Sequence, residues 1–486
     1  MSALKPEPRS EGEIRHWDGE ADVLVLGLGC AGACATLEAR ARGAEVLVLE
    51  AAGGGGGTSA NSGGLIYLGG GTPVQKACGF DDTPDEMYRF LVAASGPGAQ
   101  EDKIRTLCDE SVSHFHWLVD QGVPFKETFY PEPGMEAPTD DCLVFSGGEN
   151  CHPFNQIARP APRAHKPQVP GAGGAFLMQR LIAATEASGA QILTDTRATN
   201  PIVAADGRVV GVAASCAGET LHFRARGGVV LSGGGFVSND DMVAQHAPVI
   251  ARCNVKNGSD HDDGLAIHMA QAVGAAVIRM ETGEVALPVT IPNRMGRGIF
   301  VNGSGQRFIN EDTYFGHIGQ QSLQHQGGEV FLVLDDATYE VNMVRMQPSH
   351  VAESIDELEQ QAGFPEGSLQ ATVALYNRHA AKREDPVFHK SPELLTPLDH
   401  PPFAILDCRP AACIYAGFTT GGLHTRVTGE VLNPLGDPVP GLFAAGRSAA
   451  LLSGTQYPAS GISLADATLF GRYAGSTAAG AATSGL

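Results

Sequence analysis

The feature that most constrains the fold is a glycine turn between an apolar strand and a helix. Residues 21–26 have the sequence Ala-Asp-Val-Leu-Val-Leu, which is typical of a buried strand in a parallel sheet. The turn Gly27-Leu28-Gly29-Cys30-Ala31-Gly32 follows, and residues 33–42 have helical composition. A second apolar strand, 45–49, ends at Glu50. This order predicts a Rossmann-type βαβ unit that binds a dinucleotide.

Each residue type in the turn has a physical role in that prediction. Glycines allow a tight turn, close approach of the backbone to a pyrophosphate, and close packing of helix on strand. The N-terminus of the following helix attracts the phosphate charge. Glu50, 18 residues after Gly32, can accept hydrogen bonds from ribose hydroxyls. We therefore expect contacts to the dinucleotide from Gly27, Gly29, Cys30, Ala31, Gly32, Glu50 and Ala51.

Later glycine-rich segments indicate that the dinucleotide is FAD rather than NAD. Thr58–Gly64 follows five glycines and offers many backbone N–H donors and small side chains beside a flat ring. Residues 229–235 are a second glycine-rich segment, in which a further apolar strand runs into three glycines. Residues 441–447, Gly-Leu-Phe-Ala-Ala-Gly-Arg, form the late strand and turn at which a flavoprotein chain returns to its cofactor.

Composition and charge exclude several other classes of protein. The 486 residues carry a formal net charge of −21, whereas a nucleic-acid partner requires clustered Lys and Arg. No stretch approaches the ~18 consecutive apolar residues of a membrane span, and the polar N-terminus has no signal-like segment. The ten cysteines are scattered without metal or redox spacing, which favours a reducing cytoplasm.

The order of the segments predicts an α/β protein with an α+β insert. Residues 198–215 suggest a hairpin around Asp206-Gly207, and residues 417–475 suggest short strands and turns. Because both ends of the chain have similar composition, we expect one discontinuous cofactor domain. Its predicted parts are residues 1–274 and 415–486, and the insert, residues 275–414, is predicted to be a catalytic cap.

Several long strings resemble a known family. The Gly27 turn, Thr58–Gly64 and Ala444–Arg447 resemble the fumarate reductase/succinate dehydrogenase flavoprotein superfamily over nearly the whole chain. Within it, residues 64–82 and Phe145–Asn150 resemble the bacterial 3-ketosteroid Δ4-(5α)-dehydrogenases. More distantly, the chain resembles the 3-ketosteroid Δ1-dehydrogenases. No histidine stands in Thr58–Gly64, where covalent relatives attach their flavin, so this resemblance implies noncovalent FAD.

The resemblance also implies a reaction and a wider set of cofactor contacts. The substrate class is a saturated 3-ketosteroid: a base removes a proton from C4, and hydride leaves C5 for flavin N5. An unidentified acceptor then takes the electrons. The further contacts to FAD are expected from Gly57, Thr58, Ser59, Ser62, Gly63, Gly64, Ile66, Val203, Ser232, Gly233, Asp263, His424, Gly446, Arg447, Gly461, Ile462 and Ser463.

Four residues are expected at the reacting end of the steroid. Tyr314 and Ser460 match the family's tyrosine and proton-relay serine, and Gly461 offers a backbone N–H. The family's other tyrosine lies two residues before the serine, where this chain has Pro458. Tyr457 is one position earlier and is the candidate for that role, as base or as carbonyl donor.

Three alternatives stay open at the level of sequence. The Tyr457-Pro458 pair resembles the Δ1 enzymes, so the double bond could form at C1 instead of C4. Reduction of an unsaturated acid is disfavoured, because residues 448–464 contain no Arg, Lys or His to bind a carboxylate. A flavin-holding subunit without catalysis is the third alternative. We expect no metal, because Asp262 and Asp263 suggest a helix N-cap. Arg307 is expected to be structural rather than a clamp for the substrate.

Overall fold

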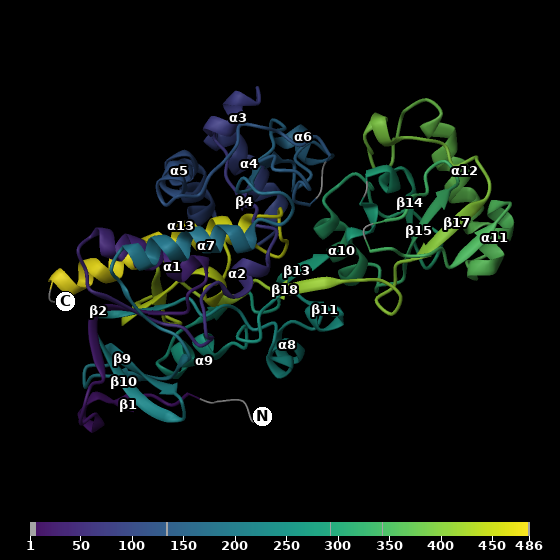
Figure 1. The fold of residues 1–486 in the computed structure, drawn as a ribbon. Coiled ribbons are helices and arrows are strands. Elements are labelled where there is room, and N and C mark those ends of the chain that lie inside the picture. Colours follow the sequence, from purple (N-terminus) through teal and green to yellow (C-terminus); the bar gives the residue numbers. More distant parts are fainter. Residues whose placement is uncertain (1–5, 133–134, 292, 343, 485–486) are drawn as a thin grey trace.

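The computed structural model describes residues 6–132, 135–291, 293–342 and 344–484. A large sheet forms the core of the larger of its two lobes (Figure 1). Its strand order is β1-β8-β9-β10-β2-β3-β7, with β21 beside β10. The predicted strand after the N-terminal tail is confirmed; it is central, and its residues 23–26 are apolar and buried. The parallel strands are β2 (Gly19–Leu26), β3 (Val46–Leu49), β7 (Gln191–Leu193), β21 (Pro438–Ala444) and the second half of β10 (Glu219–Leu231).

One long strand joins the parallel sheet to an antiparallel extension. The first half of β10 pairs with β9 (Val209–Cys216), and β9 pairs with β8 (Thr196–Val203) in the hairpin predicted around Gly207. Gly207 has φ of +88°, the left-handed conformation that this tight turn requires. The short strands β1 (Arg9–Ser10) and β20 (Glu430–Leu432) complete the sheet. The α/β class predicted from the sequence is confirmed.

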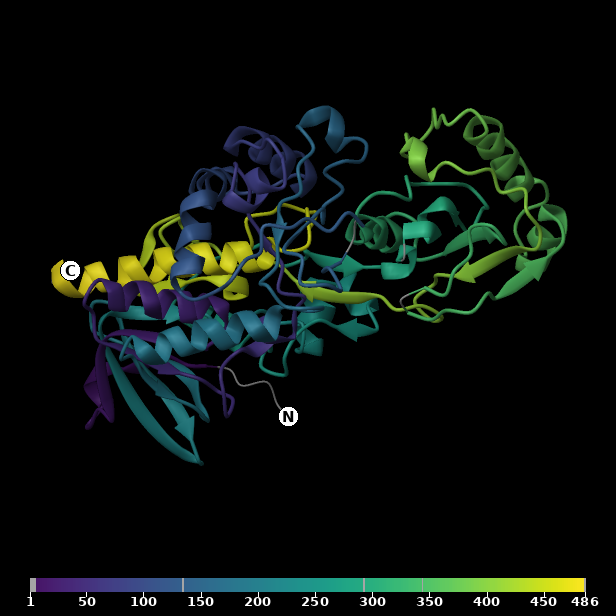
Figure 2. The ribbon, with the colours of Figure 1, turned by 45° about the horizontal axis from the view of Figure 1, so that its top comes forward.

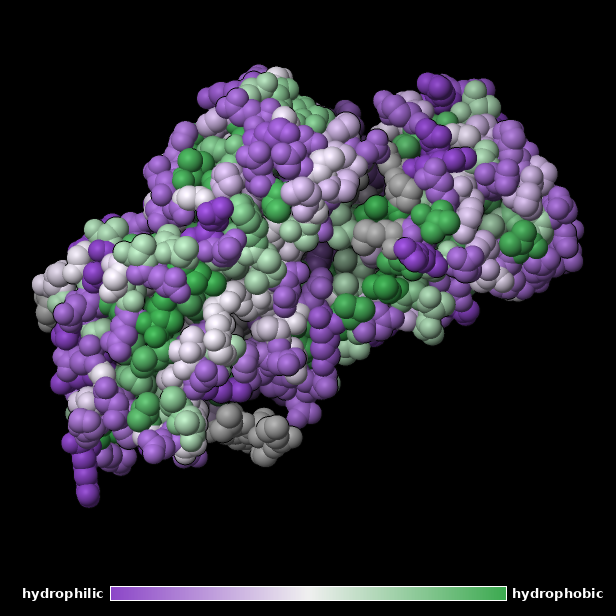
Figure 3. Space-filling model, in the orientation of Figure 1, coloured by the Kyte–Doolittle hydropathy of each residue, from purple (hydrophilic) through white to green (hydrophobic). Residues whose placement is uncertain are grey.

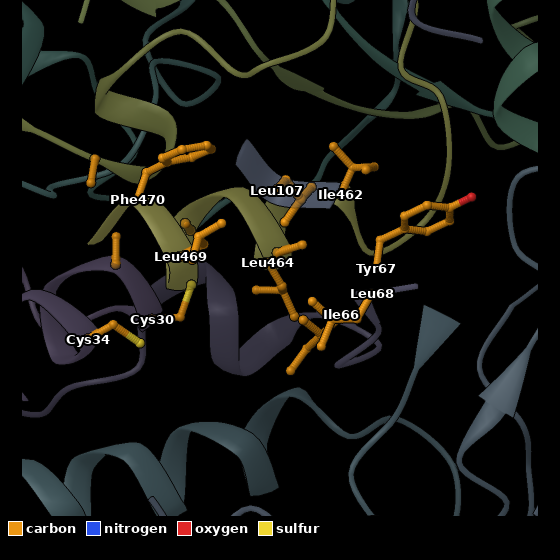
Figure 4. Packing of buried hydrophobic residues seen from close by; sticks show 14 of the residues in the cluster. Cys30, Cys34, Ile66, Tyr67, Leu68, Leu107, Ile462, Leu464, Leu469 and Phe470 are labelled. Carbon is orange, nitrogen blue, oxygen red and sulfur yellow. The ribbon is translucent and has the colours of Figure 1, made fainter. Parts of the chain in front are cut away.

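Three helices run along one face of this sheet: α1 (Cys30–Ala41), α7 (Gly174–Ala187) and α13 (Ile462–Ser484) (Figures 1 and 2). The prediction of short strands and turns is confirmed for residues 417–461 but is wrong for residues 462–475, which lie in α13, a helix of 23 residues. Its glycines serve helix packing: a Cβ added at Gly475 would lie 2.0 Å from the Ala35 carbonyl oxygen of α1. Figure 4 shows side chains of both helices meeting in the core, including Cys30, Ile462 and Leu464.

Smaller elements surround the carboxyl ends of the parallel strands, where α/β proteins bind ligands. The helix α2 (Gly57–Asn61) follows the five glycines. Above it lie α4 and α5 with a three-stranded sheet in the order β4-β6-β5. These and neighbouring elements are α3 (Pro73–Ala77), α4 (Pro84–Ser95), α5 (Glu101–Asp120), α6 (Phe154–Ile157), β4 (Ile66–Tyr67), β5 (Leu143–Val144), β6 (Ala164–His165), α8 (Asp240–His246) and α9 (Leu265–Ala272).

A second lobe is built on the four-stranded antiparallel sheet β14-β15-β17-β16 (Figure 1). Its elements are β14 (Ile299–Asn302), β15 (Val330–Asp335), β16 (His350–Ala352), β17 (Phe403–Asp407), α11 (Ile355–Ala362) and α12 (Ser368–Ala380). This sheet lies inside the predicted insert, while the boundaries at residues 275 and 414 stay a prediction. No helix among the described residues is long and apolar enough to cross a membrane.

A small sheet and a helix connect the two lobes. The strand β18 (Ala416–Thr419) lies between β11 (Val255–Lys256) and β13 (Gly283–Ala286). The helix α10 (Phe315–Gln324) packs on β13, and Gly319 makes this contact close, since a Cβ there would lie 2.2 Å from the Val285 carbonyl oxygen. Residues of β13 and of the start of α10 are therefore held at the junction of the lobes. The pair β12 (Val277–Ile278) and β19 (Gly422–Leu423) lies nearby.

Candidate active site

One long cavity joins the glycine turn to the junction of the lobes. Its volume is about 770 Å³, within the range of ligand and cofactor sites. The glycine turn and Glu50 line one end, whereas Glu284, Phe418, Tyr457 and Ser460 line the other. Figure 3 shows the molecule hollowed between the two lobes, with hydrophobic residues beside the hollow on the smaller lobe. The cavity can therefore hold an extended dinucleotide together with an apolar ligand.

The backbone of the glycine turn fits a dinucleotide closely. Gly27 has φ of +98°, and a Cβ added at Gly32 would lie only 1.9 Å from the Gly27 carbonyl oxygen. The hydroxyl of Ser232, directly after β10, donates to the Leu26 carbonyl at 2.9 Å and so ties the neighbouring strand to the turn. The Glu50 carboxylate accepts the Leu28 N–H at 2.6 Å and lines the cavity, where it can also receive ribose hydroxyls.

A second group of polar contacts surrounds Asp262. Its carboxylate accepts hydrogen bonds from Thr58 Oγ1 at 2.5 Å, from the Gly235 N–H at 3.0 Å and from Arg447 Nη2 at 2.6 Å. Asp262 therefore holds three cavity segments together and caps no helix. Arg447 Nη1 is buried at the cavity without a hydrogen-bond partner, so it is a donor left over for a bound anionic or polar group. These features fit FAD: walls of glycine backbone and small side chains, the Glu50 carboxylate that can accept ribose hydroxyls, and the free Nη1 donor of Arg447.

Most of the predicted cofactor residues line this cavity. These are Gly27, Gly29, Cys30, Ala31, Glu50, Ala51, Gly57, Thr58, Ser59, Ser62, Gly63, Gly64, Ser232, Gly233, Asp263, Gly446, Arg447, Gly461 and Ser463. Gly32 lies behind the turn, where it allows the close packing described above. Asp263 accepts a hydrogen bond from the Leu265 N–H at 3.0 Å and pairs with Arg197. Which of them touch FAD stays a prediction.

Four predicted cofactor residues lie away from the cavity lining. Ile66 and Ile462 face the core between the helices instead (Figure 4). Val203 is at the far end of β8, five residues beyond Ala198, because this strand runs away from the cavity; the residues at its start, Thr196 to Ala198, line the cavity. His424 follows β19, outside the lining residues, and its backbone N–H donates to the Ala276 carbonyl.

Two of the predicted catalytic residues, Ser460 and Tyr314, meet at the other end of the cavity. Ser460 lines the wall, and its hydroxyl lies 3.1 Å from the Tyr314 hydroxyl behind it. Tyr314 precedes α10, is 4% exposed, and donates to the Glu284 carboxylate of β13 at 2.7 Å. Ser146 fixes the backbone of Ser460 in both directions: its carbonyl accepts the Ser460 N–H, and its hydroxyl donates to the Ser460 carbonyl.

Tyr457 lines the same end of the cavity from the segment before α13. Its hydroxyl oxygen accepts the Ser463 N–H at 3.1 Å and lies 3.2 Å from Ser463 Oγ. The Tyr457 ring meets Phe418 edge to face, with centroids 5.4 Å apart. Gly461 has φ of +101°, and its carbonyl accepts the Tyr67 N–H, so the turn after Ser460 needs glycine.

The electrostatics separate the roles of the two tyrosines and the carboxylate. Burial and the nearby Glu284 charge raise the pKa of Tyr314 well above its usual value, and burial raises the pKa of Tyr457. Both phenols therefore stay protonated at neutral pH and can donate or relay a proton but are poor bases. Burial raises the pKa of Glu284 to about 7, although the Tyr314 hydrogen bond and the Arg447 charge lower it.

Sequence reasoning missed Glu284. It is the only charged residue of β13, a short apolar strand, and is 5% exposed. An acidic residue in a buried strand was a usable signal, since such a group needs a partner or a function. Arg307, in contrast, is structural as predicted: it pairs with Glu311 at 2.7 Å and with Asp385 at 2.9 Å inside the second lobe.

Comparison with known proteins agrees with this geometry. The model of the FAD binding domain family matches residues 22–464. The structure of 3-ketosteroid-Δ4-(5α)-dehydrogenase from Rhodococcus jostii RHA1, in complex with 4-androstene-3,17-dione, has 48% sequence identity and a TM-score of 0.94, over 97% of this chain and 99% of that chain.

Two characterised relatives are more distant. The 3-oxo-5-alpha-steroid 4-dehydrogenase of Comamonas testosteroni is 26% identical over 66% of this chain and 68% of that protein. The urocanate reductase of Eggerthella lenta is 26% identical over 95% of this chain and 75% of that protein. The cofactor predicted from the glycine segments is thus confirmed as FAD. The chain belongs to the FAD binding domain family and is similar along nearly its whole length to a 3-ketosteroid-Δ4-(5α)-dehydrogenase.

Proposed function

We propose that this protein is an FAD-dependent dehydrogenase that converts saturated 3-ketosteroids into 4-ene-3-ketosteroids. The observation that carries this proposal is the Ser460–Tyr314 pair on the wall of an apolar cavity end, beside the hydroxyl of Tyr457. The similarity to a steroid dehydrogenase at 48% identity supports the substrate class. FAD, held noncovalently, supplies the hydride acceptor; the residues of the chain bind the ketone and remove the proton.

Each residue has a role that follows from its position. Ser460 faces the cavity and can take the C4 proton while its own proton moves to Tyr314, which is not among the lining residues. Tyr457 can donate to the C3 carbonyl, where negative charge develops as C4 loses its proton. The Ser463 N–H holds the Tyr457 oxygen in place, so only the hydroxyl hydrogen must turn from Ser463 Oγ to the ligand.

The charges of the cavity disfavour carboxylate substrates such as fumarate or urocanate. Such acids need cations that are free to pair with them. Among the described lining residues, each Arg and Lys side chain is paired with a carboxylate, and the spare Nη1 of Arg447 belongs to a segment that is predicted to contact FAD. These pairs are Arg197–Asp263, Lys256–Asp240 and Arg447–Asp262. A neutral ketone with an apolar body fits this wall better.

Product analysis tests the proposal most directly. Under anaerobic conditions, 5α-androstane-3,17-dione should bleach the flavin and yield the 4-ene-3-ketone, identified by mass spectrometry against standards. A 1-ene product would assign the enzyme to Δ1 chemistry instead. Unchanged flavin absorbance with several 3-ketosteroids would remove the steroid assignment, and turnover of fumarate with reduced viologen would replace it with a reductase.

The location of the enzyme and its electron acceptor are separate proposals. All ten cysteines are free, and several are buried, which favours a reducing compartment such as the cytoplasm. Cell fractionation with antibody detection tests this location. The acceptor that reoxidises FAD can be sought by adding quinones, dyes or oxygen to the steroid-reduced protein and following the return of flavin absorbance.

A further inference from the structure

The buried carboxylate of Glu284 lies at the inner end of a hydrogen-bonded chain that begins on the cavity wall. The chain runs from Ser460 Oγ to Tyr314 Oη over 3.1 Å and from Tyr314 Oη to Glu284 Oε1 over 2.7 Å. An ionised carboxylate can only accept hydrogen bonds, so Tyr314 must donate to Glu284. The Tyr314 oxygen can then accept a hydrogen bond from the Ser460 hydroxyl. A lone pair of the Ser460 oxygen stays available to a donor in the cavity. This polarity suits proton movement inward from the cavity.

Neither hydroxyl can hold the substrate proton for long. Serine and a buried tyrosine are both far weaker bases than a carboxylate at neutral pH. The relay therefore needs an acceptor beyond Tyr314, and Glu284 is the residue that Tyr314 contacts. Other carboxylates of the described lining serve different parts of the cavity: Asp262 holds Arg447, and Glu50 holds the glycine turn.

We propose that Glu284 is the proton acceptor of the reaction and acts through Tyr314 and Ser460. This inference rests on the proposed function. As the C4–H bond breaks, the proton moves to Ser460, the Ser460 hydroxyl proton moves to Tyr314, and the Tyr314 proton moves to Glu284. The electron pair of the C4–H bond becomes the C4–C5 double bond while hydride leaves C5 for FAD. Glu284 also lines the cavity, so water can take its proton once the product has left.

The surroundings of Glu284 support a carboxylate that changes its charge near neutral pH. Burial raises its pKa to about 7, so the ionised acceptor and its protonated form are both accessible in the cell. The adjacent strand β18 offers no titratable side chain between residues 416 and 419. The titratable or charged groups that face Glu284 and its partner are Tyr314 and His317 from α10, Tyr457 before α13, Arg447 from η6 (Gly446–Ser448) and Cys253 before β11.

Rapid-mixing kinetics of flavin reduction test this role. In the wild type, the rate of reduction by a saturated 3-ketosteroid should rise with pH through about 7, as Glu284 ionises. Glu284→Gln should slow reduction roughly 100-fold or more and remove this rise, with steroid affinity changed less than about 5-fold. Glu284→Asp should restore part of the rate and of the rise. Wild-type rates and an unchanged rise in Glu284→Gln would overturn the proposal.

A second buried pair provides the matched control. Tyr67 donates to Glu149 at 3.0 Å, and Glu149 is 1% exposed, but neither residue is among the cavity lining. Glu149→Gln should keep the rise in rate with pH. If Glu149→Gln also lost the rise of the reduction rate with pH, the loss in Glu284→Gln would reflect a general disturbance of the structure. The assignment of Glu284 as proton acceptor would then fail.

Infrared titration of the FAD-loaded protein without steroid separates this inference from the function. A carboxylic-acid band should grow as pH falls through about 7 and be absent in Glu284→Gln. Tyr314→Phe should move the midpoint of this band to higher pH, because the ionised form loses its hydrogen-bond donor. An unchanged midpoint would refute the coupling. If the wild type showed this titration but no steroid reduced its flavin, the proposed function would fail while the Tyr314–Glu284 coupling stood.

Discussion

Replacing Glu284 by Gln should stabilise the protein at alkaline pH even though it should slow the reaction. The pKa of this carboxyl is raised from 4.5 to about 7 by burial, so the folded state binds its proton more tightly than the unfolded state. The stability that this proton contributes is therefore complete below about pH 4.5 and is lost as pH rises through about 7. Gln has the shape of the neutral carboxyl and keeps an oxygen for the Tyr314 hydroxyl.

The expected magnitude follows from the size of the pKa change. The difference between about 7 and 4.5, at about 1.4 kcal/mol per pKa unit, is about 3 kcal/mol of unfolding free energy at pH 8. A chain of 486 residues has an unfolding entropy of about 1 kcal/mol per degree, so the melting temperature should rise by about 3 °C. The difference from wild type should shrink towards zero near pH 5.

Thermal melting from pH 5 to 8.5, followed by circular dichroism in FAD-loaded protein, measures this difference. Glu219→Gln at the exposed start of β10 is the control for removing a carboxylate from a strand. The argument that burial holds a proton on Glu284 would be refuted if Glu284→Gln and the wild type had the same melting temperature at pH 8. It would also be refuted if the difference in melting temperature grew towards pH 5.

Three further substitutions address the cofactor, the relay and the second lobe. Gly32→Ala should abolish FAD binding, visible as colourless purified protein, because its Cβ would lie 1.9 Å from the Gly27 carbonyl oxygen. Ser460→Ala should keep bound FAD but slow flavin reduction by steroid about 100-fold or more in single-turnover kinetics. Lys390→Met should cost about 3–5 kcal/mol in thermal melting, because buried Glu311 loses one of its two cations; wild-type melting would contradict this.

The cofactor end of the site could be predicted because its signals are local in sequence. The Gly27–Gly32 turn and Glu50 lie within one βαβ unit, so the spacing alone places them at the same end of two strands. For Val203 no such local spacing exists: its strand begins at the cavity and runs away from it, so its contact with FAD stays a prediction. The position of His424 depends on how β19 pairs with β12, which no local pattern encodes, and its contact with FAD also stays a prediction.

The helix α13 and Glu284 were missed because tertiary contacts decide their roles. The many small residues of α13 suggested turns, yet Gly471 and Gly475 permit close packing on Ala31 and Ala35 of α1. Glu284 meets Tyr314 30 residues later only because α10 folds back onto β13. Motifs predicted a role for Ser460 and Tyr314, but their hydrogen-bond partner Glu284 could be found only in the structure.

The position of the new double bond depends on a part of the site that these motifs do not describe. Tyr457 and Ser460 lie on one short segment, held by Ser463 and by Ser146. Their separation is therefore fixed, and in the proposed reaction a ketone bound to Tyr457 would have a neighbouring carbon at Ser460. C2 and C4 are both neighbours of the C3 carbonyl, and turning the steroid over exchanges them. The apolar walls around Phe418 must thus select between Δ4 and Δ1 products, because the same relay can serve either carbon.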